Sequence, residues 1–451
     1  MQYALPHAVE AVLAALENAG YEAYLVGGCV RDHLMGRTPQ DYDITTSALP
    51  EQTLQVFSHL RVIETGLKHG TVTVVCEGMP LEITTYRTDG SYSDSRRPDS
   101  VQFTRSLRED LARRDLTVNA MAMDRLGNIT DPFGGCGDIK AKLLRTVGDA
   151  DTRFAEDALR ILRTLRFASK LGFHIESETE AALLRGKDSL HRISAERIFS
   201  ELTALLMGDG ARDVLVNYFP IISTVLPELA PMHGMQQYNP YHIYDVWQHT
   251  AAVVDAAPKT PALRWAALLH DCEKPSCFHR DEKGIGHFYG HAQKSAKLAD
   301  KILRRLKASN ALREEVCALI DVHDDPMPLS DKVVRKRLSK LGEERFFRVL
   351  QLKEADSRGQ NPEKLPASGQ HLEALRQTAE RLLQTEGVIT VATLAVNGAD
   401  LMTLGLSGKA IGKAQQSLLT RVLDGKLKNN RDALLKAAKQ NAPKKSAQVR
   451  E

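Results

Sequence analysis

The spacing of apolar residues changes near residue 150, and this change constrains the fold more than any other feature of the sequence. Before it, an amphipathic segment opens the chain, the run Tyr-Leu-Val follows at residues 24–26, and runs rich in Val, Ile and Thr follow at residues 71–76 and 81–86. Such runs are typical of β-strands. After it, apolar residues recur with the period of a helix, with almost no strand signal before residues 388–391. The sequence therefore predicts an α+β head followed by a long helical body.

Several classes of protein are excluded by composition. No stretch approaches the roughly 18 apolar residues of a membrane span, and the chain starts without the basic and small-residue pattern of a signal peptide. The six cysteines form no C-x-x-C pair, so neither a disulfide framework nor a thiolate zinc site is indicated. We expect a reduced, cytoplasmic protein without a membrane partner.

The formal net charge of +3 hides an uneven distribution. From Lys409 to the end there are eleven Lys and Arg against three Asp and Glu, so the remainder of the chain is mildly acidic. A basic tail favours a polyanionic partner. The alternative is a solvated C-terminal helix that frays.

The segment 25–46, LVGGCVRDHLMGRTPQDYDITT, contains residue types that bind phosphates and divalent cations. Gly27 and Gly28 let backbone N–H groups approach a phosphate, and Arg31 can add a guanidinium to the same anion. Asp41 and Asp43 are two residues apart on an expected strand, so both carboxylates project to one face. Converging carboxylates repel unless a cation lies between them, and Mg²⁺ bridging to phosphates is the usual solution. An exposed Asp pair at a strand end is the alternative.

Residues 156–160, EDALR, can recognise a base. Asp157 and Arg160 are spaced i and i+3, which on a helix places both side chains on one face. Cytosine and adenine each offer an amine beside a ring nitrogen, so a carboxylate accepts from one while a guanidinium donates to the other. Uracil and guanine would present a carbonyl to the carboxylate, a mismatch worth about 1–3 kcal/mol. An ordinary i,i+3 ion pair is the alternative.

The pattern GG-x-x-RD…D-x-D resembles the signature of the DNA polymerase beta nucleotidyltransferase superfamily. The full run is similar to the bacterial class II group, which contains tRNA CCA-adding enzymes and poly(A) polymerases. Further motifs follow in the order of that group: RRDLTVNAMA (113–122), DPFGGCGDI (131–139), RFAEDALRILRTLRF (153–167) and ISAERIFSEL (193–202).

The resemblance implies the site residues of the head. Asp41 and Asp43 correspond to the catalytic Mg²⁺ ligands. The positions that correspond to nucleotide contacts are Gly28, Arg31, Arg114, Asp157, Arg160, Arg163 and Arg166. Glu82 is either a third acidic group near the metals or a strand-surface residue. The implied reaction is in-line attack of an RNA 3′-hydroxyl on the α-phosphorus of CTP or ATP, with release of pyrophosphate.

Residues 87–98 are polar and turn-rich, which predicts a mobile loop. In enzymes of this group, such a loop accompanies the switch to ATP for the last addition. Its presence here, with Arg96 and Arg97, favours the full CCA reaction.

The body contains clustered histidines and carboxylates, a donor set that suits Mn, Fe, Ni, Co or Zn. Their order resembles the HD phosphohydrolase superfamily, and the resemblance implies a ligand set of His249, His270, Asp271, His291, His323 and Asp356. Cys272-Glu273 replaces the glycine-containing turn of that superfamily, which would crowd the site or alter its metal preference. Lys274 is retained and could hold a phosphate.

The combined prediction is a polymerase-beta-like head (1–140), an elongated all-α neck (141–225), an HD-type domain (226–380) and a basic tRNA-binding tail (381–451). The expected protein adds CCA to tRNA from CTP and ATP, as a monomer or homodimer, with an additional phosphohydrolase activity of the HD domain. The alternatives are a poly(A) polymerase, a CC- or A-adding enzyme, and an HD phosphohydrolase with an RNA-binding head.

Overall fold

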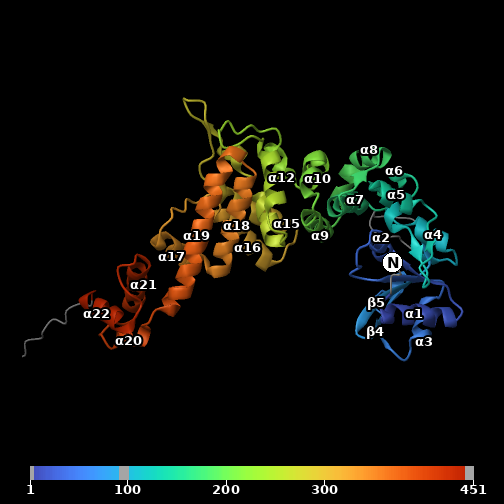
Figure 1. Ribbon diagram of the computed structural model, residues 1–451, viewed down its shortest axis with the longest axis horizontal. Helices are drawn as coiled ribbons and strands as arrows, with labels where there is room; N and C mark the ends of the chain where they lie inside the picture. Colours follow the sequence, from blue (N-terminus) through green and yellow to red (C-terminus); the bar gives the residue numbers. More distant parts are fainter. Residues whose placement is uncertain (1–4, 65, 91–100, 442–451) are drawn as a thin grey trace, which may run out of the picture. The chain divides into compact units, whose positions relative to one another are not determined.

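The computed structural model describes residues 5–64, 66–90 and 101–441 and divides the chain into two compact units (Figure 1). Unit 1 comprises residues 1–230 and 302–308, and unit 2 comprises residues 231–301 and 309–451. Unit 1 contains the mixed sheet, and unit 2 is almost entirely helical. The predicted α+β class is therefore confirmed, whereas the division into four domains stays a prediction.

The head is built on a seven-stranded sheet in the order β3-β4-β5-β2-β1-β8-β9. Its strands are β1 (Ala23–Val26), β2 (Asp43–Thr46), β3 (Arg61–Ile63), β4 (Thr71–Cys76), β5 (Met79–Thr85), β8 (Ala122–Met123) and β9 (Ile129–Thr130). The β2–β5 pair is parallel, and the other neighbouring pairs are antiparallel. This arrangement brings the start of β2 into the middle of the sheet.

The local sequence explains these strands. In β4 the residues TVTVVC alternate between half-buried and buried, and β-branched side chains suit such a pleated surface. The helix α1 (His7–Asn18) packs against strands β1 and β4, and the helix α3 (Pro50–Val56) packs against strands β4 and β5 (Figure 1). The buried face of α1 includes Val9, Val12, Leu13 and Leu16, the apolar residues of the opening amphipathic pattern. The remaining helices of the head are α2 (Gly28–Leu34), α4 (Leu107–Ala112) and α5 (Gly135–Ala141).

The segment predicted as a mobile loop begins as a strand. Residues Arg87–Asp89 form β6 and pair antiparallel with β7 (Val101–Phe103). The backbone N–H of Arg87, the first residue of β6, donates to the buried carboxylate of Asp110 at 3.3 Å. Arg96 and Arg97 lie outside the described residues.

Helices follow the head in unit 1. They are α6 (Ala150–Glu156), α7 (Leu159–Leu171), α8 (Ser177–Gly186), α9 (Ala195–Leu206), α10 (Ala211–Asn217) and α11 (Phe219–Val225), with the short parallel strands β10 (Leu143–Leu144) and β11 (His174–Ile175). Helix α7 packs against α9 and ends at Gly172, whose φ of +68° suits a glycine in the left-handed cap. The first turn of α7 begins with Leu159 and Arg160, the last two residues of the EDALR segment.

Up to residue 441, where the described part of the chain ends, unit 2 consists of helices and one small hairpin (Figure 1, yellow-green to red). The helices are α12 (Val246–Ala256), α13 (Pro261–Leu269), α14 (Lys274–Cys277), α15 (His291–Arg305), α16 (Asn310–Val322), α17 (Asp331–Leu341), α18 (Glu343–Arg358), α19 (Leu365–Glu386), α20 (Gly398–Met402), α21 (Lys409–Leu423) and α22 (Arg431–Asn441). The hairpin pairs β12 (His279–Arg280) with β13 (Gly286–His287). Side-chain caps start several helices, as where Asp245 accepts from the Gln248 N–H.

The strand signal at residues 388–391 was wrong. Val391 instead begins a short 3₁₀ helix, Val391–Thr393. The Thr393 hydroxyl accepts from the Thr390 N–H at 2.8 Å, and such local side-chain bonds compete with strand pairing. Among the described residues, no helix combines the length and apolar character that a membrane crossing needs.

Candidate active site and metal centre

Gly27 forms the turn between β1 and α2, and its conformation requires glycine. Its φ and ψ are +76° and −130°, in a region that residues with a Cβ rarely adopt. A Cβ here would lie 3.3 Å from Arg114 Nη1 and 3.8 Å from Asp43 Oδ2. The absence of a side chain therefore lets a guanidinium and a carboxylate meet over the turn. Gly28 is the first residue of α2, and a Cβ there would make only an ordinary 3.6 Å contact with Arg31 Nη2.

Of the paired aspartates, only Asp43 belongs to β2, and Asp41 lies two residues before it, so the expectation that both lie on one strand was wrong. Asp43 is the first residue of the strand, opposite Val26 of β1 and Glu82 of β5. Burial, with the neighbouring charges of Asp41 and Glu82, raises the pKa of Asp43 to about 6, although Arg114 opposes the shift. Three carboxylates around one strand end are an arrangement that a divalent cation would stabilise, so the residues fit Mg²⁺.

Asp110, which the sequence analysis did not identify, fixes the groups behind this strand end. Its buried carboxylate accepts from the Thr45 hydroxyl at 3.2 Å and from Arg113 Nε at 2.9 Å. Arg114 Nη2 lies 3.6 Å away. Thus one buried acid ties strand β2 to two of the arginines. Asp110 precedes the RRDLTVNAMA motif by three residues, which was the only available signal.

The glycine turn, the paired aspartates and the arginines Arg113 and Arg114 line a cavity of about 880 Å³. All the head residues implied by the resemblance line it, and Glu82 is not among the lining residues. The lining consists of Gly27, Gly28, Arg31, Asp32, Arg37, Thr38, Gln40, Asp41, Asp43, Gly66, His69, Thr71, Arg87, Arg113, Arg114, Asp115, Asn119, Asp157, Leu159, Arg160, Arg163, Arg166, Phe167, Lys170, Leu171 and Arg197. The structure thus brings the glycine turn, the paired aspartates and the EDALR segment to one place.

The expectation that Asp157 and Arg160 share one helix was wrong. Helix α6 ends at Glu156, α7 begins at Leu159, and Asp157 between them has the extended angles −138° and 103°. This geometry arises because the Asp157 Oδ1 accepts the Leu159 backbone N–H at 3.0 Å. The two side chains do not form the ordinary ion pair that was the alternative interpretation, because each has other partners.

Arg197 of α9 holds the Asp157 carboxylate, with Nη2 to Oδ2 at 2.8 Å. Arg160 Nη1 donates to Glu156 Oε2 at 2.5 Å and to the Arg153 carbonyl at 3.1 Å, and its Nη2 donates to the Arg113 carbonyl at 3.1 Å. A guanidinium has five N–H donors and a carboxylate has about four acceptor positions, so both groups keep capacity for a ligand. Arg197 belongs to the ISAERIFSEL motif but was not identified from the sequence.

The arginines that follow on α7 are also paired. Arg163 Nε donates to Asp115 Oδ2 at 2.8 Å, and Arg166 Nε lies 3.1 Å from Glu201 Oε2. Burial works to raise the pKa of Asp115, but Arg163 outweighs it and holds the pKa well below its usual range. Burial raises the pKa of Glu201 despite Arg166 and Arg163.

Phe167 supports three guanidiniums. The Cζ atoms of Arg31, Arg163 and Arg166 lie 5.2, 5.8 and 4.4 Å from its ring centroid, within the range of cation–π contacts. A lone phenylalanine in an apolar helix face gives no sequence signal for this role. The ring holds the cations together on one wall of the cavity.

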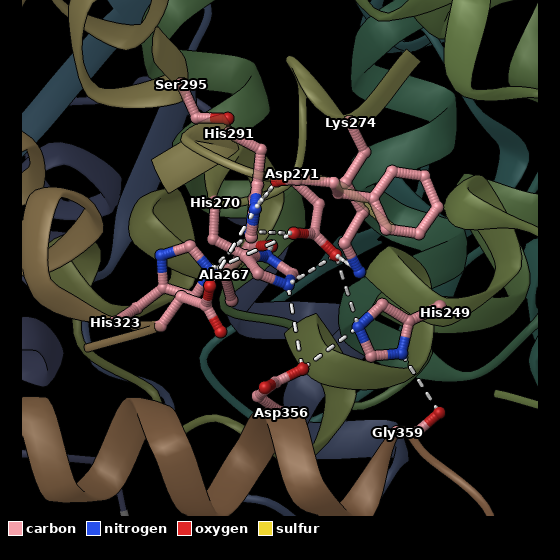
Figure 2. A network of polar contacts seen from close by, with 12 residues as sticks. His249, Ala267, His270, Asp271, Lys274, His291, Ser295, His323, Asp356 and Gly359 are labelled. Atoms are coloured by element: carbon pink, nitrogen blue, oxygen red, sulfur yellow. Dashed lines mark hydrogen bonds and ion pairs between the residues drawn. The ribbon is translucent and has the colours of Figure 1, made fainter. Parts of the chain in front are cut away.

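In unit 2, four histidines point toward two aspartates (Figure 2). The distances from imidazole Nε2 to carboxylate oxygen are His249–Asp356 3.0 Å, His249–Asp271 3.4 Å, His270–Asp271 3.1 Å, His291–Asp271 3.2 Å, His270–Asp356 3.8 Å and His323–Asp271 3.8 Å. The four imidazoles and Asp271 are buried. All six residues implied by the HD resemblance therefore meet in one cluster.

The other ring nitrogen of each of these four histidines, Nδ1, forms a hydrogen bond with a backbone carbonyl oxygen. The Nδ1 atoms lie 2.7–3.0 Å from carbonyl oxygens, His249 at Gly359, His270 at Ala267, His291 at Phe288 and His323 at Ile320. A carbonyl only accepts, so each Nδ1 carries a proton, and each Nε2 faces the carboxylates, where it can offer a lone pair to a cation once it carries no proton. Four nitrogen lone pairs and two carboxylates directed at one another fit a transition-metal cation.

The charge balance of the cluster agrees with this fit. Burial works to lower the pKa of His249, but Asp271 and Asp356 outweigh it and raise the pKa to about 9. Lys274 adds a further cation, with Nζ 2.7 Å from Asp271 Oδ2. The buried Asp271 carboxylate thus requires positive charge, which a bound metal would supply.

The expectation that Glu273 would crowd this cluster was wrong. Glu273 has a φ of −104°, so the turn does not require glycine. Its side chain bonds the Ser276 hydroxyl, outside the cluster, and its N–H donates to Ser295 Oγ at 3.1 Å. The turn after the HD pair therefore leaves the ligands in place.

Two neighbours of the cluster were missed by sequence reasoning. The His242 ring lies edge-on to His249 at 4.9 Å, and burial together with Lys274 and His249 lowers the pKa of His242 to about 3. Gln237 Oε1 accepts from Lys274 Nζ at 2.9 Å. Neither residue stands in an HD-like pattern, so the sequence held no signal for them.

Three families match parts of this chain. Residues 23–145 match the Poly A polymerase head domain, residues 172–231 match the probable RNA and SrmB-binding site of polymerase A, and residues 278–438 match the putative tRNA nucleotidyltransferase domain 2. The first match covers the sheet that carries Asp41 and Asp43.

Similar whole proteins were also found. The CCA-adding enzyme of Geobacillus kaustophilus (strain HTA426) is 39% identical over 393 residues, covering 87% of this chain and 85% of that protein. The CCA-adding enzyme of Geobacillus stearothermophilus is 36% identical over 427 residues, covering 94% of each. The crystal structure of the Bacillus stearothermophilus CCA-adding enzyme in complex with CTP matches with a TM-score of 0.73 and 32% identity over 96% of each chain. The Thermotoga maritima CCA-adding enzyme complexed with tRNA shares the fold, with a TM-score of 0.57 and 20% identity.

Proposed function

Because the chain belongs to the family of CCA-adding enzymes, we propose that it adds CCA to the 3′ ends of tRNA from CTP and ATP and releases pyrophosphate. The arrangement of Asp157 and Arg160 carries this proposal. Each is fixed by partners from the protein, and each keeps hydrogen-bonding capacity toward the cavity.

This arrangement can select bases without a template. The Asp157 carboxylate accepts from the amine of cytosine or adenine, and Arg160 donates to the adjacent ring nitrogen. Uracil and guanine would place a carbonyl against the carboxylate, which costs about 1–3 kcal/mol for the mispaired group. Because Arg197 and Glu156 hold the two side chains, little conformational entropy is lost when the base binds.

The remaining groups of the cavity suit the triphosphate. Arg31, Arg114, Arg163 and Arg166 are directed toward the cavity and can bind phosphate oxygens. Asp41 and Asp43 would hold Mg²⁺, which supplies charge neutralisation for the attacking hydroxyl and the leaving pyrophosphate. Gly28 at the start of α2 leaves room for a phosphate.

The C-terminal helices suit contact with tRNA. Helices α20 to α22 form a small hydrophobic cluster of their own, and α21 and α22 carry several lysines and arginines. Such side chains bind phosphates without reading sequence, as recognition of an RNA stem by shape requires. We place the reaction in the cytoplasm, and we keep the division into head, neck, HD-type domain and tail as part of the proposal.

The test is nucleotide incorporation into a tRNA transcript that lacks its last three bases, with CTP alone, ATP alone or both. We expect two C residues, then one A, then a halt. Addition of CC only or A only would identify a specialised enzyme, and an unbounded A tail would identify a poly(A) polymerase. Incorporation of UMP as readily as CMP would contradict the proposed base selection.

We propose a second activity, metal-dependent phosphate-ester hydrolysis, because four Nε2 lone pairs converge with Asp271 and Asp356. The six residues of the cluster would hold one or two ions of Mn, Fe, Ni, Co or Zn. Such an ion polarises a phosphoryl oxygen and activates water when bound. Lys274, fixed between Asp271 and Gln237, can contact the phosphate of the substrate.

Hydrolysis of bis(p-nitrophenyl) phosphate with each metal in turn tests this second activity. We expect it to be lost in Asp271→Asn while nucleotide addition persists. Hydrolysis that survives in Asp271→Asn would come from elsewhere in the chain and would contradict the assignment.

A further inference from the structure

Exposed aromatic side chains gather beside the histidine cluster. Tyr238 and Tyr289 are 50% and 77% exposed, although large apolar side chains are usually covered. Tyr241 and Ile243 are 52% and 54% exposed and follow Tyr238 closely in the chain. We call Tyr238, Arg280, His287 and Tyr289 the aromatic ledge.

The ledge consists of two stacked pairs. The Arg280 guanidinium lies over the Tyr238 ring, with Cζ 4.2 Å from the centroid. The rings of His287 and Tyr289 are stacked at 5.3 Å with an interplanar angle of 7°. Each pair presents a flat, delocalised surface, and flat surfaces of this kind stack with nucleobases.

Backbone and side-chain contacts of the fold hold Tyr238, Arg280 and His287 in place. Strands β12 and β13 carry Arg280 and His287, and the Gly286 N–H donates to the Tyr238 carbonyl at 2.8 Å. A Cβ at Gly286 would lie only 2.1 Å from the Gln237 carbonyl oxygen, so the close approach of hairpin and loop requires glycine. His287 Nε2 is held by Asp281 Oδ2 at 2.9 Å. A surface fixed in this way loses little entropy when a ligand binds.

A continuous set of contacts joins the ledge to the metal cluster. Phe278 lies 6.1 Å from Tyr238 and 5.6 Å from Phe288, measured between ring centroids. Lys274 Nζ lies 5.2 Å above the Phe288 ring and 2.7 Å from Asp271 Oδ2. The backbone also connects them, because the Phe288 carbonyl accepts from His291 Nδ1 at 2.8 Å.

We propose that the aromatic ledge binds the nucleobase of a nucleotide whose phosphate lies at Lys274 and the histidine cluster. This inference rests on the proposed phosphohydrolase site and names its substrate class, a nucleotide or a terminal nucleotide of RNA. Stacking tolerates every base because each has a π face, so the site distinguishes nucleotides from other phosphate esters rather than one base from another.

The arrangement of charge favours a nucleotide over a protein partner. Specific protein interfaces bury about 800 Å² per partner around a packed apolar centre. Here the Arg280 guanidinium lies over the exposed Tyr238 ring, and the ledge adjoins the buried Lys274, which suits a phosphate. A small planar ligand with an anionic group matches both features.

Photolabelling of the full chain with 8-azidoadenosine monophosphate, followed by peptide mapping, tests the proposal without requiring hydrolysis. We expect label in the peptides that contain Tyr238 or Tyr289, and competition by adenosine monophosphate but not by ribose 5-phosphate. Tyr289→Ala should reduce labelling of these peptides about tenfold, and Tyr289→Phe should restore it because the ring is kept. Labelling in the head serves as an internal control for folding.

Leu329→Ala is the matched control, because Leu329 is another half-exposed apolar side chain of unit 2. It should leave the label unchanged. Absence of label from the ledge peptides, or labelling that is equal in wild type and Tyr289→Ala, would overturn the proposal. Absence of hydrolysis with every ester and metal would instead contradict the phosphohydrolase activity and leave the labelling result to decide the binding of the base.

Discussion

The cavity of the head and the histidine cluster of unit 2 both concentrate charge, but they do so in opposite ways. In the head, most cations already have a protein carboxylate or carbonyl as partner, as with Arg163 on Asp115 and Arg197 on Asp157, and the groups face an open cavity. In the cluster, the four imidazoles and Asp271 are buried, and imidazole Nε2 atoms and carboxylate oxygens face one another.

This difference shows how each site is suited to its ligand. A cavity of pre-paired charges keeps its shape without a ligand and offers the remaining donors and acceptors to an exchanging nucleotide. A buried set of converging lone pairs is complete only with a cation, and it suits a resident metal. We expect the two sites to respond differently to mutation, acid and chelation.

The largest effect is expected from Asp43→Asn, which removes one of the proposed Mg²⁺ ligands. Nucleotide addition should fall by at least about 10³-fold, the scale for losing a principal electrostatic contribution. Steady-state addition to tRNA measures it, and retained binding of tRNA controls for folding. Glu77→Gln, an exposed acid of the same domain, is the matched control, and equal losses in both variants would contradict the assignment.

Asp115→Asn should lower the free energy of unfolding of unit 1 by about 3 kcal/mol at neutral pH, because Arg163 loses its buried partner. The pKa of Asp115 is held below its usual value, so its contribution is complete above about pH 4 and is lost as the pH falls further. The difference between variant and wild type should therefore shrink in acid.

Hydrogen exchange of α7 amides under denaturant, measured at several pH values, tests this. Asp151→Asn removes an exposed partner of Arg185 and should cost less than about 1 kcal/mol. A difference between Asp115→Asn and wild type that stays constant down to pH 2 would refute the assigned pKa.

Binding of a divalent transition metal should stabilise unit 2 by about 2.7 kcal/mol at a concentration of 100 Kd. The two tryptophans of the chain, Trp247 and Trp265, are both buried in unit 2, so thermal unfolding followed by tryptophan fluorescence reports on this unit. The shift should disappear with chelator and in His270→Ala, and persist in His287→Ala. A metal shift that is equal in His270→Ala and wild type would place the metal elsewhere.

Arg197→Met is expected to have a smaller effect, because Arg197 holds the Asp157 carboxylate and is assigned here the role of positioning it. Discrimination between CTP and UTP, as the ratio of kcat/KM values, should fall about tenfold, since Asp157 loses its fixed orientation. Arg185→Met, in an exposed pair, should leave the ratio unchanged. Loss of activity with CTP and UTP in equal proportion would show that Arg197 acts only on stability.

Much of this could be predicted from the sequence, because several features are local. The strand at residues 71–76 has a period-2 pattern, and the glycine pair and D-x-D motif lie on consecutive elements. The histidines of the cluster stand in an ordered pattern along the chain, and they meet as expected.

The sequence did not predict which side chains pair with the site residues, because these pairs form between segments that are far apart in the chain. Asp157 pairs with Arg197, 40 residues away, and its bond to the Leu159 N–H breaks the helix that the i,i+3 spacing suggested. Phe167 and Asp110 act through packing and burial, which leave no motif of their own. Glu273 does not crowd the cluster, because its φ of −104° suits a residue with a side chain, whereas an effect on the metal preference stays a prediction.

The most direct test of the base-selecting pair is the ratio of kcat/KM for CTP to that for UTP in wild type and in Asp157→Asn. The asparagine amide offers a donor to the uracil carbonyl, so the repulsion that excludes uracil is removed. We predict that the ratio falls by about 10- to 100-fold, equivalent to about 1–3 kcal/mol. An unchanged ratio in an active Asp157→Asn enzyme would contradict the assignment of Asp157 as the group that reads the base.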